Sequence, residues 1–187
     1  MSEKTSTSLG RGRGLAALYL AGILVMASGI TGFAHNESGR GQRLEGTWLV
    51  QVTLRNCATN ASMGSFNSLV SFHAGGTLSE TTSSPGFAAG QRSPGHGEWA
   101  FEGHRTYSQR MISLINFDTA ANLPGTPTFN PSLPVSPGFF AGWVTVDHTV
   151  ELTDKDHLTS SGTNEFYKTD GTQYRAGCSA AVATRFE

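Results

Sequence analysis

From residue 44 onward, hydrophobic and polar residues alternate along the chain in short runs. A period of two is the pattern of a β-strand that buries one of its faces. Turn signals such as Gly75-Gly76 and Asp170-Gly171 separate these runs. The pattern predicts strands over residues 44–54, 65–73, 77–82, 97–102, 105–117, 139–152, 157–167 and 172–186.

Consecutive strands joined mostly by short turns predict an all-β fold, an eight-stranded antiparallel up-and-down barrel. A β-sandwich uses similar strands but usually needs longer connections between its two sheets. We expect the barrel domain to span residues 44–187, behind a flexible N-terminal segment at residues 35–43. Closure of the barrel would make the first and last strands antiparallel neighbours.

The first 34 residues are typical of a secretory signal peptide. Two arginines precede the uncharged run of residues 15–34, and small residues up to Ala34 favour cleavage before His35, with an earlier option at Ala27. The run is long enough to span a bilayer, so an uncleaved membrane anchor is the alternative. The signal predicts a secreted or periplasmic protein.

Charge narrows the range of partners. Cleavage would remove three of the 13 basic and one of the 14 acidic residues, leaving ten against thirteen and a net charge of −3. The absence of a basic patch argues against nucleic acid as a partner. After cleavage we expect no membrane association, and the sequence leaves the oligomeric state open.

The chain has two cysteines, Cys57 and Cys178, and they do not form a C-x-x-C motif. A lone pair in an exported protein indicates one disulfide, with two free buried thiols as the alternative. In a closed barrel this bridge would join the first and last strands. If the cysteines are direct cross-strand partners, Val50 faces Arg185; a Cys57 just past its strand would loosen that register.

Gly46-Thr47-Trp48, near the start of the first strand, resembles the G-x-W signature of the lipocalin and calycin barrels. In that family a late arginine packs over the tryptophan, and Arg185 is the matching residue here. The resemblance implies structural roles for Trp48 and Arg185 and a cation–π contact between them. The chain lacks the family's T-D-Y motif and C-terminal helix, so it resembles an outlying bacterial secreted member. Allene oxide cyclase-type barrels resemble it about as well in strand pattern.

The inward faces of the strands supply a candidate ligand-binding wall. His148 shares its strand face with four aliphatic residues, which predicts that it points into the barrel. There it would orient a polar ligand group or act as a base; the alternative is a histidine hydrogen-bonded within the core. The expected ligand-binding residues are Phe66, Phe72, Trp99, Phe101, Tyr107, Met111 and His148.

Other motifs have both a functional and a structural interpretation. In Gly95-His96-Gly97-Glu98-Trp99, the glycines would let the backbone approach a ligand, or would simply form a turn at a strand entrance. Five prolines, in the range Pro124 to Pro137, would form a semi-rigid lid or a docking strip. The alternative is a long hairpin connection that resists aggregation.

Metal and nucleophile signatures are missing from the sequence. The histidines after residue 44 lie in separate segments, without H-x-H or H-x-x-x-H spacing: His73, His96, His104, His148 and His157. We therefore predict no metal site and no cofactor. There is no G-x-S-x-G elbow, and neither cysteine has a histidine nearby in sequence, so no catalytic residue is predicted.

Three hypotheses for function follow from the sequence. The first is a secreted protein that binds a small apolar or amphipathic ligand in its barrel. The second is an isomerase or cyclase-type enzyme that holds a reactive substrate in shape, with His148, Glu98 and Arg110 as its polar groups. The third is a structural or partner-binding module whose barrel is filled.

Overall fold

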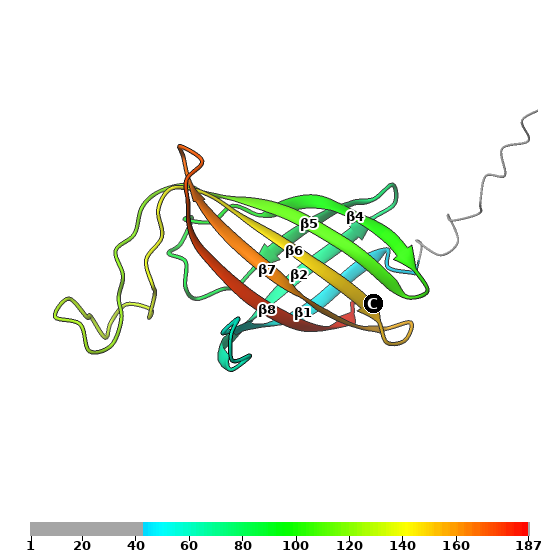
Figure 1. Cartoon of the computed structure of the whole chain (residues 1–187), viewed down its shortest axis with the longest axis horizontal. Coiled ribbons are helices and arrows are strands. Elements are labelled where there is room, and N and C mark those ends of the chain that lie inside the picture. Colours follow the sequence, from blue (N-terminus) through cyan, green and yellow to red (C-terminus); the bar gives the residue numbers. More distant parts are fainter. Residues whose placement is uncertain (1–42, 187) are drawn as a thin grey trace, which may run out of the picture. The chain divides into compact units, whose positions relative to one another are not determined.

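The computed structural model describes residues 43–186; the predicted signal peptide, and all but the last residue of the segment at 35–43, lie outside the described residues. Eight antiparallel strands follow one another around a closed barrel in sequence order (Figure 1). The all-β, up-and-down barrel predicted from the alternation is confirmed. The strands are β1 (Gly46–Arg55), β2 (Ser62–His73), β3 (Thr77–Thr82), β4 (Gly95–Gly103), β5 (Thr106–Ile115), β6 (Gly142–Leu152), β7 (His157–Lys168) and β8 (Gln173–Arg185).

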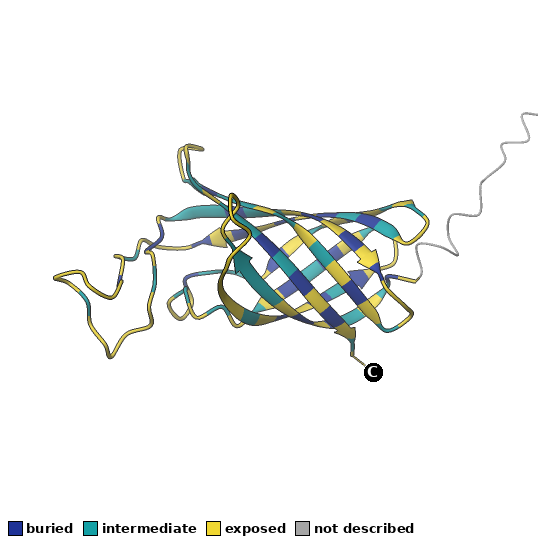
Figure 2. Cartoon of the chain, turned by 60° about the horizontal axis from the view of Figure 1, so that its bottom comes forward, coloured by how far each residue is buried: buried dark blue, intermediate teal, exposed yellow. Residues whose placement is uncertain are grey.

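Burial alternates along the strands as the period of two requires (Figure 2). In β6, for example, the side chains of Val144, His148 and Val150 are buried, while Asp147 and Thr149 between them are not. His148 therefore lies on the inward face, where the alternation placed it. Within residues 43–186, no helix is long and apolar enough to cross a membrane.

Tight turns and large side chains close one end of the barrel. The β2–β3, β4–β5 and β6–β7 turns lie here, beside the start of β1 and the end of β8. The Trp48 side chain is fully buried, and its indole Nε1 donates a hydrogen bond to the Leu44 carbonyl at 2.9 Å. Around it pack Phe72, Trp99 and Tyr107, whose rings meet edge to face. We call this region the closed end.

The pairing of β1 with β8 is shifted by two residues from the register expected if the two cysteines were direct cross-strand partners. Trp48 lies opposite Arg185 and Val50 opposite Ala183, so the pairing of Val50 with Arg185 is wrong. The physical reason is that β1 ends at Arg55, and Cys57 lies in the turn beyond it. The cysteines are therefore not direct cross-strand partners, and the strands slide by two positions while each residue keeps its face.

The contact predicted between Trp48 and Arg185 is present. The Arg185 guanidinium carbon lies 4.2 Å from the centre of the Trp48 ring, within cation–π range. The guanidinium nitrogens also donate to backbone carbonyls of Glu45, Arg43 and Lys155, at 2.6, 2.6 and 3.0 Å. Arg185 thus ties the last strand to the chain before β1 and to the β6–β7 turn, and covers the closed end.

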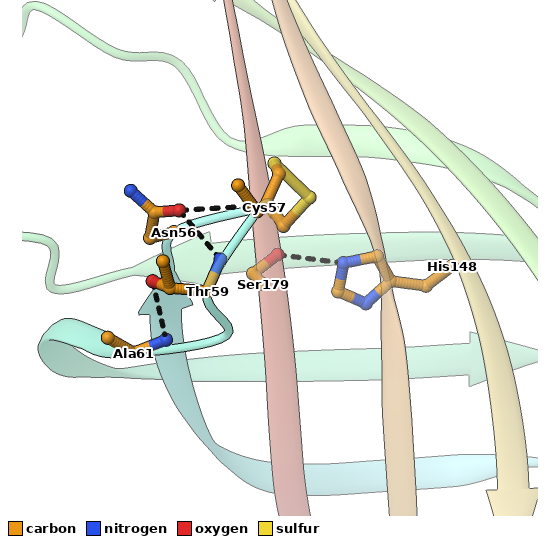
Figure 3. Close-up of a disulfide and its surroundings, with 8 residues drawn as sticks. Asn56, Cys57, Thr59, Ala61, His148 and Ser179 are labelled. Atoms are coloured by element: carbon orange, nitrogen blue, oxygen red, sulfur yellow. Dashed lines mark hydrogen bonds between the residues drawn. A yellow bond between two sulfur atoms is a disulfide. The ribbon is translucent and has the colours of Figure 1, made fainter.

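A disulfide joins Cys57 to Cys178 at the opposite end of the β1–β8 seam, with the Cα atoms 5.2 Å apart (Figure 3). The turn that carries Cys57 is held by Asn56, whose side-chain oxygen accepts hydrogen bonds from the amides of Ala58 and Thr59. The predicted cysteine pairing is confirmed. Such a bridge is typical of proteins in an oxidising environment.

Candidate functional site

A cavity of about 500 Å³ occupies the barrel interior beyond the closed end. It extends to the end that carries the disulfide and the longer loops, which we call the mouth. Every strand except β4 contributes to its lining. Its walls are mainly apolar, and the apolar side chains contributed by the strands are Val50, Val52, Leu54, Met63, Phe66, Val70, Met111, Val144, Val146, Phe166 and Ala181.

The structure divides the predicted ligand-binding wall into two groups. Phe66, Met111 and His148 line the cavity. The other predicted residues do not line it but pack into the closed end: Phe72, Trp99, Phe101 and Tyr107. Alternation indicates which face a residue occupies but not its height along the barrel axis, so the pattern alone did not separate the two groups.

His148 is buried among hydroxyl groups on the cavity wall. Its ring nitrogens lie 3.2 Å from the Ser160 hydroxyl and 2.9 Å from the Ser179 hydroxyl (the latter contact is shown in Figure 3). Burial lowers the pKa of His148 from 6.5 to about 4, although the neighbouring Asp147 carboxylate acts in the opposite direction. The histidine is therefore neutral at pH 7, with both nitrogens hydrogen-bonded.

A glycine on β7 makes room for this ring. Gly162 lies directly opposite His148, and a Cβ atom added there would come within 2.6 Å of the imidazole Cδ2 and 1.9 Å of the Asp147 carbonyl oxygen. No real side chain fits at those distances. The sequence analysis did not single out Gly162, because its role depends on the β6–β7 register.

Two amide side chains flank His148 and have no hydrogen-bond partner among the described residues. Gln109 is its direct cross-strand neighbour on β5, is buried, and lines the cavity. Asn164 on β7 lies opposite Val146 and also lines the cavity, and its buried side-chain oxygen is unpaired. Buried polar groups normally find hydrogen-bond partners. These two amides therefore form a polar part of the cavity wall whose hydrogen-bonding groups are not satisfied by the described residues.

A buried ion pair lies elsewhere on the cavity wall. The Arg92 guanidinium contacts one Glu80 carboxylate oxygen at 2.8 Å, with side chains only 8% and 4% exposed. The Ser68 hydroxyl donates to the other carboxylate oxygen at 2.7 Å. The sequence analysis missed this pair. Glu80 lies two residues after the buried Leu78, so the alternation places both side chains on the inward face of β3.

The ion pair explains part of the glycine-rich motif before Trp99. A Cβ atom at Gly95 would lie 2.9 Å from a Glu80 carboxylate oxygen, and one at Gly97 would lie 2.0 Å from the Arg110 carbonyl oxygen. Both glycines therefore serve close packing within the barrel. His96 and Glu98 alternate with them and are exposed.

The enzyme hypothesis named three polar residues, and two of them face away from the cavity. Glu98 is exposed, and Arg110 pairs with Asp147 at 3.3 Å on the outer surface, where both side chains are more than half exposed. Only His148 lines the cavity. No group of histidine, cysteine or acidic side chains suited to a metal ion occurs within residues 43–186.

The proline-containing segment between β5 and β6 contributes to the mouth. Paired backbone at Thr119 and Phe139, and at Asn122 and Ser136, makes its stem. The Asn122 side chain holds the loop together by donating to the carbonyls of Asn130, Leu133 and Pro134 and accepting from the Asn130 amide. The segment contributes four residues to the cavity lining: Leu123, Val135, Pro137 and Phe139.

Arg175 connects this segment to the barrel. Its guanidinium donates to the Pro137 carbonyl at 3.2 Å and stacks against Phe139 and Phe166, 4.9 and 5.6 Å from the ring centres. The guanidinium itself is not part of the cavity lining. The segment thus lines the mouth through its four lining residues and is attached to β8, while its tip projects away from the barrel (Figure 1).

No model of a known protein family matches the chain, and no curated protein is significantly similar to it in sequence. The lipocalin and calycin resemblance carried by Gly46-Thr47-Trp48 and Arg185 therefore stays a prediction. The site geometry is the stronger guide to function, since fold by itself does not determine function.

Proposed function

We propose that this protein binds one small apolar or amphipathic molecule inside its barrel. The observation that carries the proposal is the cavity of about 500 Å³, which the side chains of residues 43–186 leave unfilled. Ligand pockets in proteins are typically about 300 to 1,000 Å³ and mainly apolar. Apolar surface gains about 25 cal/mol for each Å² removed from water, so a largely apolar ligand is the favourable occupant.

Binding is better supported than catalysis. The enzyme hypothesis relied on His148, Glu98 and Arg110, and two of these face solvent. Both nitrogens of His148 are engaged by serine hydroxyls, and within residues 43–186 no carboxylate hydrogen-bonds the ring to orient it as a base. The site therefore resembles a mainly apolar binding pocket with a few polar groups more than an active site.

The proposal includes export and a distant relation to lipocalin-like barrels. The signal-like N-terminus and the disulfide support a secreted or periplasmic location. The packing of Arg185 over Trp48 supports the relation, because the G-x-W resemblance implies this contact. In this proposal the protein holds its ligand outside the cytoplasm.

The test measures binding of Nile red, a neutral dye that fluoresces in apolar surroundings, to the wild-type protein and two matched variants. Ala181 lines the cavity, whereas Ala180 is the next residue and lies on the opposite face of β8. We expect Ala181→Phe to weaken dye binding about tenfold or more by filling the cavity, and Ala180→Phe to leave it unchanged. Equal binding by all three proteins would place the dye elsewhere and contradict the proposal.

Native mass spectrometry of the exported protein provides an independent test. A co-purified small molecule that is present on the wild type and lost from Ala181→Phe would support the proposal. If neither a bound molecule nor dye binding is found, the third hypothesis, a structural or partner-binding module, becomes the better explanation.

A further inference from the structure

We infer that the ligand is uncharged and presents a hydrogen-bonding head group to Gln109 and Asn164, beside the His148 ring. This inference rests on the proposed function and adds the chemical class of the ligand. Suitable classes are long-chain alcohols, ketones and primary amides, whose apolar bodies would lie along the aliphatic walls. Ionised fatty acids and alkylammonium ions are excluded.

The charge balance of the cavity argues against a charged ligand. Among residues 43–186, the charged residues in its lining are Glu80 and Arg92, and they neutralise each other at 2.8 Å. Each Glu80 carboxylate oxygen already accepts one hydrogen bond, from Ser68 or from Arg92. A carboxylate or ammonium group brought into this wall would find no free counter-charge, and burying an unpaired charge is costly.

The unpaired amides indicate where the head group lies. The Gln109 side chain, buried on the cavity wall, has no hydrogen-bond partner among the described residues, and neither has the buried side-chain oxygen of Asn164. An amide both donates and accepts, so a hydroxyl, carbonyl or amide of the ligand would satisfy it. By contrast, both oxygens of Glu80 accept hydrogen bonds within the protein, and the charge of Arg92 is balanced by Glu80.

Register places these groups together on one part of the wall. Gln109 lies directly opposite His148, and Asn164 lies opposite Val146, two positions before His148 on the same face of β6. Gln109 and His148, as direct cross-strand neighbours, stand about 4.5 to 5.5 Å apart, and Asn164 is a diagonal neighbour of His148, about 7 to 8 Å away, so a head group beside the His148 ring lies between the two amides. His148 is held by Ser160 and Ser179, so its ring is fixed in place beside the two amides.

The experiment measures displacement of Nile red from the wild-type protein by three probes of equal chain length: dodecanol, dodecanoate and dodecylammonium. The probes are used at pH 8, where the acid and amine are ionised, and below their micelle-forming concentrations. We expect dodecanol to bind at least about tenfold more tightly than either ion. Equal or tighter binding of dodecanoate or dodecylammonium would overturn the inference.

Three variants then test where the head group lies. Gln109→Met and Asn164→Leu remove the amides at similar volume, and each should weaken dodecanol about threefold to tenfold more than it weakens Nile red. Gln51→Met, the same change at an exposed position of β1 outside the cavity lining, should leave dodecanol affinity unchanged. If dodecanol binds both amide variants as tightly as the wild type, the inference is wrong.

The two proposals fail in distinguishable ways. Nile red binding without displacement by dodecanol would overturn the inference while leaving the binding function in place. Failure of Nile red itself to bind would contradict the binding function. If an amide variant does not fold, the probe series on the wild type still decides between neutral and charged ligands.

Discussion

The closed end and the mouth are built from the same alternating strands but differ in what fills them. At the closed end, Trp48 and Tyr107 are fully buried, and the indole nitrogens of Trp48 and Trp99 donate to backbone carbonyls. Towards the mouth, smaller side chains such as Val146 and Ala181 leave a cavity, and Gln109 on its wall has no hydrogen-bond partner among residues 43–186. An eight-stranded barrel is just wide enough for side chains to fill. The volume of the inward side chains therefore decides which part of the interior is a packed core and which part is a cavity.

The largest expected effect comes from emptying the closed end. Trp48→Ala removes the largest fully buried side chain and the surface on which Arg185 packs. We expect a loss of up to about 5 kcal/mol in the free energy of unfolding, measured by urea denaturation. Trp143→Ala, which removes an incompletely buried tryptophan stacked on Tyr167, is the control and should cost far less. Similar losses in both variants would mean that the closed end is not the main core.

The disulfide is expected to act at the mouth. Cys57 and Cys178 are 121 residues apart in sequence, and removing a loop closure of this length costs up to about 5 kcal/mol, less any strain in the native bridge. In a Cys57→Ser/Cys178→Ser variant, amides near Leu54 and Ser179 should lose hydrogen-exchange protection first. Amides of the residues beside Trp48 should keep theirs. Equal loss along the whole seam would contradict this division between the two ends.

A pH titration probes the buried histidine on the cavity wall. The pKa of His148 is about 4 in the folded protein, below the ordinary histidine value of 6.5, so the unfolded chain binds the proton more readily between these values. Stability from this group is complete above pH 6.5 and is lost as pH falls towards 4, by about 3 kcal/mol. Urea denaturation should show this loss in the wild type and a smaller one in His148→Gln. Identical pH profiles would show that His148 is not the group responsible.

The smallest effect on stability is expected from the segment between β5 and β6 at the mouth. Asn122 and Ser136 are paired through their backbones, so a two-glycine turn can replace residues 123–135. Because the loop lies outside the strands, we expect a change in the free energy of unfolding within about 1 kcal/mol. Nile red should dissociate faster, because Leu123 and Val135 leave the cavity lining. An unchanged dissociation rate would mean that the segment does not cover the ligand, and a large loss of stability would mean that it belongs to the core.

Several features of the molecule were predictable from local sequence pattern. The period of two identified eight strands and placed His148 on an inward face, because side-chain direction alternates in every strand. The two cysteines indicated the bridge, and the resemblance around Trp48 indicated its contact with Arg185. Each of these depends on spacing along the chain or on a short motif.

Other features depend on how the strands are paired. The β1–β8 register, the pair between Glu80 and Arg92, and the unpaired amide beside His148 all join residues far apart in sequence. Alternation is unchanged when a strand slides by two residues, so the pattern did not determine which inward residues meet. For the same reason Phe66 and Phe72, equivalent in the sequence pattern, lie in different regions: Phe66 lines the cavity, and Phe72 packs in the closed end. The direction of each side chain is a local property, whereas its height and its neighbours are set only by closure of the barrel.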